Sequence, residues 1–292
     1  NVGWLTASGL LAVMVVSLLF GQPGEPTTTL GGMVRFDWLG FFFKMLFMFA
    51  GAATALLFMD NEKIGHRGEA YLLLLASLLG MNLMAASADL VMLYLAIETT
   101  SIPLYVLSGF MLADNKSTEA GFKYLLFGAL ASTIMLYGFS LVFGFTGTTS
   151  LYQLADMLKA GNLPLTTALG VLALILVGLG FKVSLVPFHF WAPDVYEGAP
   201  TPVSGFLSTA SKAAGFAVLI RLFFVAFPDF AESWTLVLAV LSAITMTVGN
   251  LLTLQQTNIK RLLAYSSIAH AGYTLIGVVA LSQLGAASVV FY

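Results

Sequence analysis

The sequence predicts an all-α integral membrane protein, a polytopic bundle of about nine complete membrane-spanning helices with the start of a tenth. Of its 292 residues, 59% are hydrophobic and 9% are charged, whereas soluble domains carry about 25% charged residues. The mean hydropathy is +0.94. Apolar runs long enough to cross a bilayer as helices, about 20 residues each, recur along the chain. So few charged side chains cannot cover a water-facing surface, and the outside must therefore face lipid.

The spans follow in order from the apolar runs and the short polar breaks between them. The runs are too long for barrel strands and lack strict alternation, so we expect helices. Because the last run stops at Tyr292 and the chain begins with Asn1, we expect an internal piece of a longer protein. The expected spans are Val2–Phe20, Trp38–Phe58, Ala70–Ala86, Leu90–Leu112, Glu119–Phe145, Pro164–Val186, Thr201–Phe227, Trp234–Thr253 and Ile259–Leu281, with a tenth from near Leu284.

Two further features predict what lies at the membrane surface. In Ser150–Ala160, Leu151, Leu154 and Leu158 recur at helical spacing, which predicts a short amphipathic helix on that surface. Tryptophan is typical of the interfacial aromatic belt. All four tryptophans fall near expected span ends, at Trp4, Trp38, Trp191 and Trp234.

The basic loop residues predict the orientation. If the spans alternate, one side has Arg35 and Lys159, with Lys44 and Arg221 near span ends. The positive-inside rule places the other, more basic side in the cytoplasm, so we expect a multi-pass protein of the cell inner membrane. That side collects Lys63, Arg67, Lys116, Lys260 and Arg261.

Several kinds of site are excluded or disfavoured. The absence of cysteine excludes iron–sulfur clusters, thiolate zinc sites and disulfides in this chain. The three histidines, His66, His189 and His270, are too scattered to suggest a metal site. No glycine-rich phosphate loop is present, and the formal net charge of −2 argues against nucleic-acid binding. We therefore expect no cofactor in this chain, and any redox chemistry would belong to a partner.

Glu98 is an ionisable residue inside an expected span, where a charge costs about 2.5–3.5 kcal/mol on insertion scales. Thr99, Thr100 and Ser101 follow it, and Pro103 frees the carbonyl of Thr99 because proline has no N–H to donate. We expect a kink and a local polar pocket that takes part in proton transfer. The alternative is a structural salt bridge that holds two helices together.

Lys182 is flanked by helix-breaking residues on both sides, with Gly178 and Gly180 before it and Pro187 after it. This pattern predicts a broken helix, and unwound backbone is tolerated in a membrane only inside protein or beside a watery cavity. Desolvation favours the neutral form of a buried lysine, so such a residue can load and release a proton. The alternative is a lysine that snorkels to the membrane surface.

Lys212 lies at the centre of an expected span and shares a polar helical face with Ser204, Ser208 and Ser211. Small residues around it allow close helix packing. We expect Lys212 to be a proton relay group, the alternative being a packing face with a paired lysine.

Three further residues are secondary relay candidates. His270 and His189 titrate near neutral pH, although a lone core histidine is often simply hydrogen-bonded. Lys123 follows Glu119 by one helical turn, so an ordinary i,i+4 ion pair is the alternative for it.

The stretch FKVSLVPFHFWAPDVYEGAPTPVSGFLSTASKAAGFAVLIRLF, from Phe181 to Phe223, resembles the antiporter-like membrane subunits of respiratory complex I, NADH:quinone oxidoreductase. The variant HFWAPDVYEGAPTPV followed by SKAAGFA is most similar to the subunit N branch. Subunits M and L and Mrp-type cation/proton antiporters share only parts of this sequence variant. The resemblance also includes IETTSIPLYVL and NIKRLLAYSSIAHAGY and extends over essentially the whole chain.

The resemblance implies a fold with two inverted repeats of about five helices, each containing a broken helix. Residues 1–69 would be N-terminal transmembrane helices, 70–227 the first repeat and 228–292 the start of the second. The lysine of the second broken helix would fall beyond Tyr292. Partners would be other complex I membrane subunits and the lipid bilayer, with no nucleic acid. NADH, FMN, iron–sulfur clusters and quinone would be bound by partner subunits.

The resemblance also implies a mechanism. Glu98 and Lys182 match the family's glutamate–lysine pair, and Lys212 matches its central relay lysine. Quinone reduction elsewhere would open the pair, and loss of the carboxylate would favour release of the lysine proton toward Lys212. Lys123, His189 and His270 match further polar positions on the membrane axis.

Two alternatives to this mechanism stay open. A subunit of an Mrp-type antiporter would depend on sodium and would have no quinone-reductase partner. A non-pumping scaffold would keep proton transport intact after its buried charges are removed.

Overall fold

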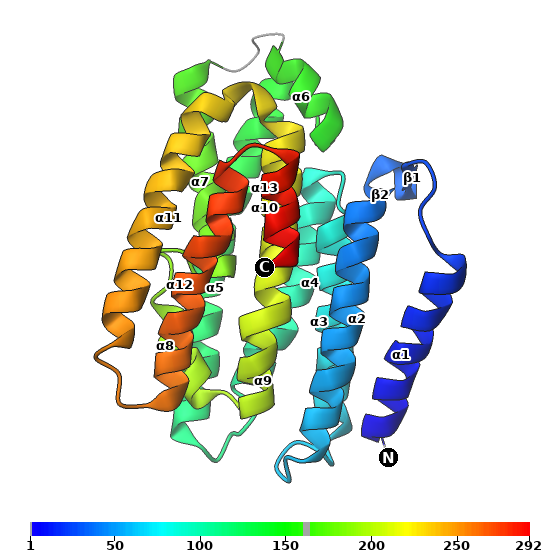
Figure 1. The fold of residues 1–292 in the computed structure, drawn as a ribbon, viewed down its shortest axis with the longest axis vertical. Coiled ribbons are helices and arrows are strands. Elements are labelled where there is room, and N and C mark those ends of the chain that lie inside the picture. Colours follow the sequence, from blue (N-terminus) through cyan, green and yellow to red (C-terminus); the bar gives the residue numbers. More distant parts are fainter. Residues whose placement is uncertain (1, 160–163) are drawn as a thin grey trace. The chain divides into compact units, whose positions relative to one another are not determined.

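The computed structural model describes residues 2–159 and 164–292 (Figure 1). Within these residues, nine helices are long and apolar enough to cross a membrane, which confirms the predicted class of polytopic helical membrane protein. The chain forms two compact units. Unit 1 contains residues 1–125 and 195–217, and unit 2 contains residues 126–194 and 218–292.

Unit 1 is built on α1 to α4, which are blue to cyan in Figure 1. Helix α3 packs along α4, and α2 packs against both α1 and α3. Fully buried side chains between them include Phe47, Phe58 and Met81. The elements are α1 (Val2–Phe20), α2 (Trp38–Met59), α3 (Gly68–Ala86), α4 (Leu90–Ser108), the start of α5 (Asn115–Thr146), the end of α8 (Trp191–Gly198), α9 (Thr201–Phe206), the π-helical turn η2 (Leu207–Ser211) and the start of α10 (Lys212–Arg221).

The close packing of α3 on α4 depends on Gly80. A Cβ atom at this position would lie 2.5 Å from both the backbone nitrogen and Oγ1 of Thr100, and 2.8 Å from the carbonyl carbon of Thr99. Only a residue without a side chain lets the two backbones approach this closely, as in other small-residue contacts between membrane helices. Gly80 therefore sets the position of the segment of α4 that carries Glu98.

A β-hairpin between α1 and α2 is a feature that the hydropathy pattern did not predict. Strand β1 (Thr27–Thr29) pairs antiparallel with β2 (Val34–Phe36), so that Thr27 faces Phe36. A short 3₁₀ turn η1 (Leu30–Gly32) connects the strands. Its residues have φ values of 50°, 67° and 91°, and the two glycines adopt this left-handed region without steric cost. Strands of three residues are too short to produce a periodic signal in the sequence.

Unit 2 contains the remaining helices, and α11 packs along α12 with α13 beside α12. The hydroxyl of Ser242 in α11 donates to the carbonyl of Gly272 in α12 at 2.7 Å. The elements are the rest of α5, α6 (Leu151–Lys159), α7 (Leu165–Val183), the start of α8, the rest of α10, the π-helical turn η3 (Leu222–Ala226), the 3₁₀ turn η4 (Pro228–Phe230), α11 (Ala231–Thr253), α12 (Ile259–Val279) and α13 (Gln283–Phe291).

The predicted spans are confirmed as helices, with differences at some ends. The fourth ends at Ser108 rather than Leu112. The fifth begins at Asn115 rather than Glu119, where Asp114 Oδ1 accepts from the backbone nitrogen of Lys116 at 3.0 Å. Such a side chain satisfies one of the free N–H groups at a helix start. Residues at such helix ends are polar, so a search for apolar runs does not include them in the predicted span.

The amphipathic helix is confirmed as α6, and the end of its predicted range, Ala160, lies outside the described residues. Its three leucines are buried, and the helix packs against η3 and η4. Two of the four tryptophans expected in the aromatic belt are covered by protein rather than exposed. Trp191 and Trp234 are 2% and 1% exposed, and their indole nitrogens donate to the carbonyls of Phe181 and Phe227.

Candidate functional site

Glu98 lies in α4 within unit 1, and its Oε1 atom is buried without a hydrogen-bond partner among the described residues. The three hydroxyls that follow it, which the sequence predicted to form a polar pocket, also bond within the helix. They donate to carbonyls of their own helix four residues earlier. The bonds run from Thr99 to Leu95 at 2.7 Å, from Thr100 to Ala96 at 2.9 Å and from Ser101 to Ile97 at 2.6 Å. Glu98 therefore keeps acceptor capacity that its neighbours do not satisfy.

A tyrosine lies on the same face of α4 as Glu98. Positions three and seven residues after Glu98 fall on its side of the helix, and these are Ser101 and Tyr105. Tyr105 is buried and interacts electrostatically with Glu98 and with the Ser101 side chain. Its ring meets that of Tyr124 in α5 edge-on, with centroids 4.7 Å apart. The two phenols therefore extend the polar surroundings of Glu98 from α4 to α5.

Tyr124 continues this series toward Lys212. It is buried and interacts electrostatically with Tyr105 and with Tyr196 of α8. It also lies near Ser211 of η2, whose buried hydroxyl has no hydrogen-bond partner of good geometry among the described residues. Ser211 immediately precedes Lys212, which is 6% exposed. Unit 1 therefore contains a series of ionisable and hydroxyl side chains, Glu98, Tyr105, Tyr124, Ser211 and Lys212, in which Ser211 and Lys212 are linked by being neighbours in sequence. The sequence analysis missed the tyrosines because tyrosine within an apolar run is usually an ordinary core residue. The spacing of Tyr105 from Glu98 was the available signal.

Lys212 begins α10 directly after the π-helical turn η2. A π-helical turn accommodates an extra residue, so the polar face predicted from regular α-helical spacing changes direction here. Ser204 and Ser208, predicted on that face, donate instead to backbone carbonyls. Ser204 reaches Tyr196 at 2.9 Å and Ser208 reaches Gly205 at 2.8 Å. Of the predicted stripe, Ser211 and Lys212 remain as the buried polar pair.

Lys182 lies in the last turn of α7 within unit 2 and is 3% exposed. The predicted helix break follows it, because α7 ends at Val183 and Ser184 adopts a left-handed φ of 61°. The indole nitrogen of Trp191, at the start of α8, donates to the carbonyl of Phe181 at 3.1 Å. A snorkelling lysine would expose its ammonium group, so the burial of Lys182 argues against that alternative.

His189 lies in the non-helical segment between α7 and α8 and is buried. Burial lowers its pKa from 6.5 because desolvation disfavours the charged imidazolium, and a smaller contribution from the Pro187 backbone opposes this shift. The imidazole is therefore neutral at pH 7.

Acid should destabilise the protein through His189. With a lowered pKa in the folded state, the unfolded state binds more protons below about pH 6.5, so stability is lost as the pH falls through that range. We expect the thermal midpoint of the purified protein to fall less between pH 7.5 and 5.5 in a His189→Gln variant than in wild type. Equal slopes in the two proteins would contradict a neutral buried His189, and His66→Gln, which changes an exposed loop histidine, is the matched control.

The other secondary candidates lie in less enclosed positions. Lys123 pairs with Glu119 at 2.6 Å across one turn of α5, and both side chains are partly exposed. This is the ordinary i,i+4 pair that the sequence analysis gave as the alternative. His270 is exposed on α12 within unit 2, where its Nδ1 atom hydrogen-bonds with the hydroxyl of Tyr292. Neither residue lies in the series from Glu98 to Lys212.

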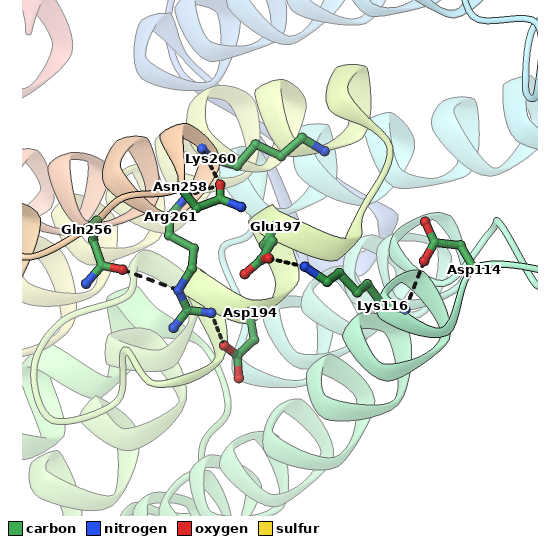
Figure 2. A network of polar contacts seen from close by, with 8 residues as sticks. All are labelled: Asp114, Lys116, Asp194, Glu197, Gln256, Asn258, Lys260 and Arg261. Carbon is green, nitrogen blue, oxygen red and sulfur yellow. Dashed lines mark hydrogen bonds and ion pairs between the residues drawn. The ribbon is translucent and has the colours of Figure 1, made fainter.

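The acidic residues of the WAPDVYEG stretch form ion pairs with basic residues at the starts of α5 and α12, as Figure 2 shows. Within unit 1, Lys116 Nζ lies 2.6 Å from Glu197 Oε1. Within unit 2, Arg261 Nη1 donates to Asp194 Oδ1 at 2.5 Å. Partly exposed pairs of this kind contribute at most about 1 kcal/mol each. These two pairs connect the ends of α8 to the starts of α5 and α12.

Within the described residues, no group of three or more histidine, aspartate or glutamate side chains could hold a metal ion.

Comparisons with known proteins identify similar chains over most of the length. Residues 87–292 match the family described as NADH:quinone oxidoreductase/Mrp antiporter, TM. NADH-quinone oxidoreductase subunit N of Moorella thermoacetica is 47% identical over 294 residues, covering 100% of this chain and 61% of that protein. The same subunit of an Anaeromyxobacter species is 45% identical over 312 residues, covering 99% of this chain and 60% of that protein. The chain thus spans about three fifths of the length of these curated relatives.

Solved structures show the same fold. A chain of respiratory complex I from Thermus thermophilus is 40% identical and superposes with a TM-score of 0.80, covering 95% of this chain and 58% of that chain. A chain of the Mrp complex from Dietzia sp. DQ12-45-1b has the same TM-score of 0.80 at 22% identity, covering 99% of this chain and 56% of that chain. The second likeness is one of fold alone.

Proposed function

Because the chain belongs to the NADH:quinone oxidoreductase/Mrp antiporter transmembrane family, we propose that it translocates protons as part of a redox-driven NADH:quinone oxidoreductase. The relatives named as subunits of that enzyme are 47% and 45% identical, whereas the Mrp chain is 22% identical. This difference favours the redox-driven complex over the cation/proton antiporter.

The series of side chains from Glu98 to Lys212 carries the proposal. Ionisable residues inside a membrane are costly and usually mark ion or proton pathways. Here a carboxylate and two buried phenols lie next to one another within unit 1, and a buried serine and a buried lysine lie in the same unit. A hydroxyl both donates and accepts hydrogen bonds, so bridging water and tyrosine side chains would carry a proton between the charged ends. A scaffold would need no such series.

In this proposal Glu98 and Lys182 are the switch residues, a role that rests on the family resemblance alone, and Lys212 stores the transferred proton. A carboxylate near a lysine favours its charged form, and moving the carboxylate away favours release of the proton. Moving one charge against 100 mV costs about 2.3 kcal/mol, and a change of one ion pair in a low-dielectric interior is large enough to supply it. Lys123, His189 and His270 would serve as secondary groups beside this path.

We also propose how the chain divides into repeats, which side of the membrane its loops face and where the cofactors are bound. Residues 70–227 would be the first inverted repeat, preceded by N-terminal helices in 1–69 and followed by the start of the second repeat in 228–292. The loops with Lys63, Arg67, Lys116, Lys260 and Arg261 would face the cytoplasm of a bacterial inner membrane. NADH, FMN, iron–sulfur clusters and quinone would be bound by partner subunits of the complex.

Replacement of either switch residue tests the proposal. We expect Glu98→Gln and Lys182→Ala, in the full-length protein within its assembled complex, to slow proton uptake about tenfold to a hundredfold, because loss of an adjacent opposite charge changes proton affinity by about one to two pKa units. Glu98→Asp keeps the charge and should retain most activity. The measurements are NADH–quinone turnover and proton uptake in proteoliposomes.

The alternatives give different results in the same assay. Normal pumping in assembled Glu98→Gln and Lys182→Ala complexes would support the scaffold and contradict the proposal. Transport that requires sodium and is independent of NADH would support the antiporter.

A further inference from the structure

A cavity of about 410 Å³ lies within unit 1 and is lined by residues of α1, α2, α3 and the strand β2. Its lining is polar near the start of α2 and the end of α3, where Arg35, Asp37, Lys44 and Asn82 lie. Farther along the two helices the lining is apolar. A site that is charged at one end and hydrocarbon-like at the other fits an amphiphile.

The charged end contains a cation that the described residues do not neutralise. Asp37 Oδ1 accepts from the backbone nitrogen of Gly40 at 2.9 Å, and Asp37 Oδ2 lies 3.4 Å from Arg35. Lys44 is half-buried, and no ion pair or hydrogen bond of its side chain is present among the described residues. Because a charge inside a membrane is costly without a partner, Lys44 is a favourable position for an anionic ligand.

A second polar group at the same end is also incompletely satisfied. The Asn82 side-chain nitrogen donates to the carbonyl of Leu78 at 2.7 Å. Its Oδ1 atom is buried and has no hydrogen-bond partner within the described part of the chain. A buried acceptor of this kind favours a ligand that donates a hydrogen bond. A phosphate with a hydroxylated headgroup provides both the anion for Lys44 and a donor for Asn82.

The position of the cavity along the helices agrees with a lipid of the bilayer. Trp38 is exposed at the start of α2, as expected of a residue at the membrane surface. Lys44 follows six positions later, about 9 Å along the helix at 1.5 Å per residue, and its long stem lets the ammonium group reach toward the headgroups. The apolar lining continues with Leu75 and Leu79, two exposed leucines one turn apart on α3.

We propose that this cavity binds an anionic phospholipid of the surrounding bilayer, with its phosphate against Lys44 and Arg35 and one acyl chain along Leu75 and Leu79. A free phosphate ion would leave the apolar part empty. A quinone would fill that part but carries no charge for Lys44. The inference concerns a lipid site and does not depend on the proton path.

Photo-crosslinking in nanodiscs tests the site in the full-length protein within its assembled complex. The probes are phosphatidylglycerol and phosphatidylcholine with the same diazirine-bearing acyl chain, and mass spectrometry identifies the labelled peptides. We expect phosphatidylglycerol to label the α2 and α3 peptides around Lys44 and Leu79 about fivefold more than phosphatidylcholine, from one basic residue near a membrane surface. Lys44→Gln should reduce this ratio to about one, whereas Lys44→Arg should keep it.

Two further variants keep the test decisive. Lys63→Gln changes a loop lysine of the same unit that does not line the cavity, and it should leave the ratio unchanged. Leu79→Trp fills the apolar part while it leaves the charges intact, and it should reduce labelling by both lipids. Equal labelling by the two lipids in wild type, competition by a neutral quinone, or crosslinks from these peptides to a protein alone would each overturn the proposal.

Discussion

Replacing Lys212 with methionine is expected to abolish proton translocation while the complex still assembles. Methionine has a similar length and fills the same apolar space, so the packing around the start of α10 is retained. The side chain loses its only exchangeable protons, and a group that transfers protons contributes about 10²–10⁴-fold to rate. We expect a larger effect than for Glu98→Gln, because Lys212 would carry the proton itself whereas Glu98 would only modulate its release.

The experiment compares proton uptake and NADH–quinone turnover in proteoliposomes containing wild type, Lys212→Met and Lys212→Arg complexes. Arginine keeps a buried positive charge but does not release its proton, so it should also be inactive. Lys63→Met, a change at an exposed loop lysine, is the matched control and should pump normally. Wild-type pumping in an assembled Lys212→Met complex would contradict the role of this lysine.

Replacing Gly80 with leucine is expected to prevent stable folding. The Cβ atom would lie 2.5 Å from the nitrogen of Thr100 and 2.8 Å from the carbonyl carbon of Thr99, and neither backbone atom can move without displacing α4. Overpacking of this kind costs about 3 kcal/mol or more when the surroundings cannot give way. Helix α4 would shift away from α3 and carry Glu98 with it.

The yield of full-length protein after mild detergent extraction and its thermal midpoint measure this effect. Gly9→Leu is the matched control, because no atom lies within 4 Å of a Cβ at Gly9 in the lipid-facing helix α1. Both variants add the same side chain to a glycine in the middle of an apolar helix. Similar yields and midpoints for the two variants would contradict the close approach of α3 and α4 at Gly80.

Hydropathy was sufficient to predict the helices because the lipid selects for long apolar runs whatever the helices pack against. The break after Lys182 was also predictable, since Gly178, Gly180 and Pro187 interrupt helical hydrogen bonding locally. Both features depend on residues close together in the chain. The close contact at Gly80 depends on which helix lies opposite, and single-chain periodicity does not contain that information.

The candidate site was only partly predictable for the same reason. Charged residues are conspicuous in an apolar span, so Glu98, Lys182 and Lys212 could be identified directly. Tyr105 and Tyr124 acquire a possible role only through the contact of their rings across α4 and α5. The burial of Trp191 also depends on a tertiary contact, because its indole nitrogen bonds to a carbonyl at the end of α7.

The π-helical turn next to Lys212 gives this residue a freedom that a regular helix would not. Successive residues of an α-helix are separated by about 100° around the axis, and η2 holds one residue more than an α-helical turn of the same kind. If the π-helical turn shifted along the helix by one residue, so that it included Lys212, the lysine side chain would rotate by about 100° around the helix axis. The rest of the helix would stay intact. Under the proposed function, the backbone at this position would allow the charge on Lys212 to face two directions in turn.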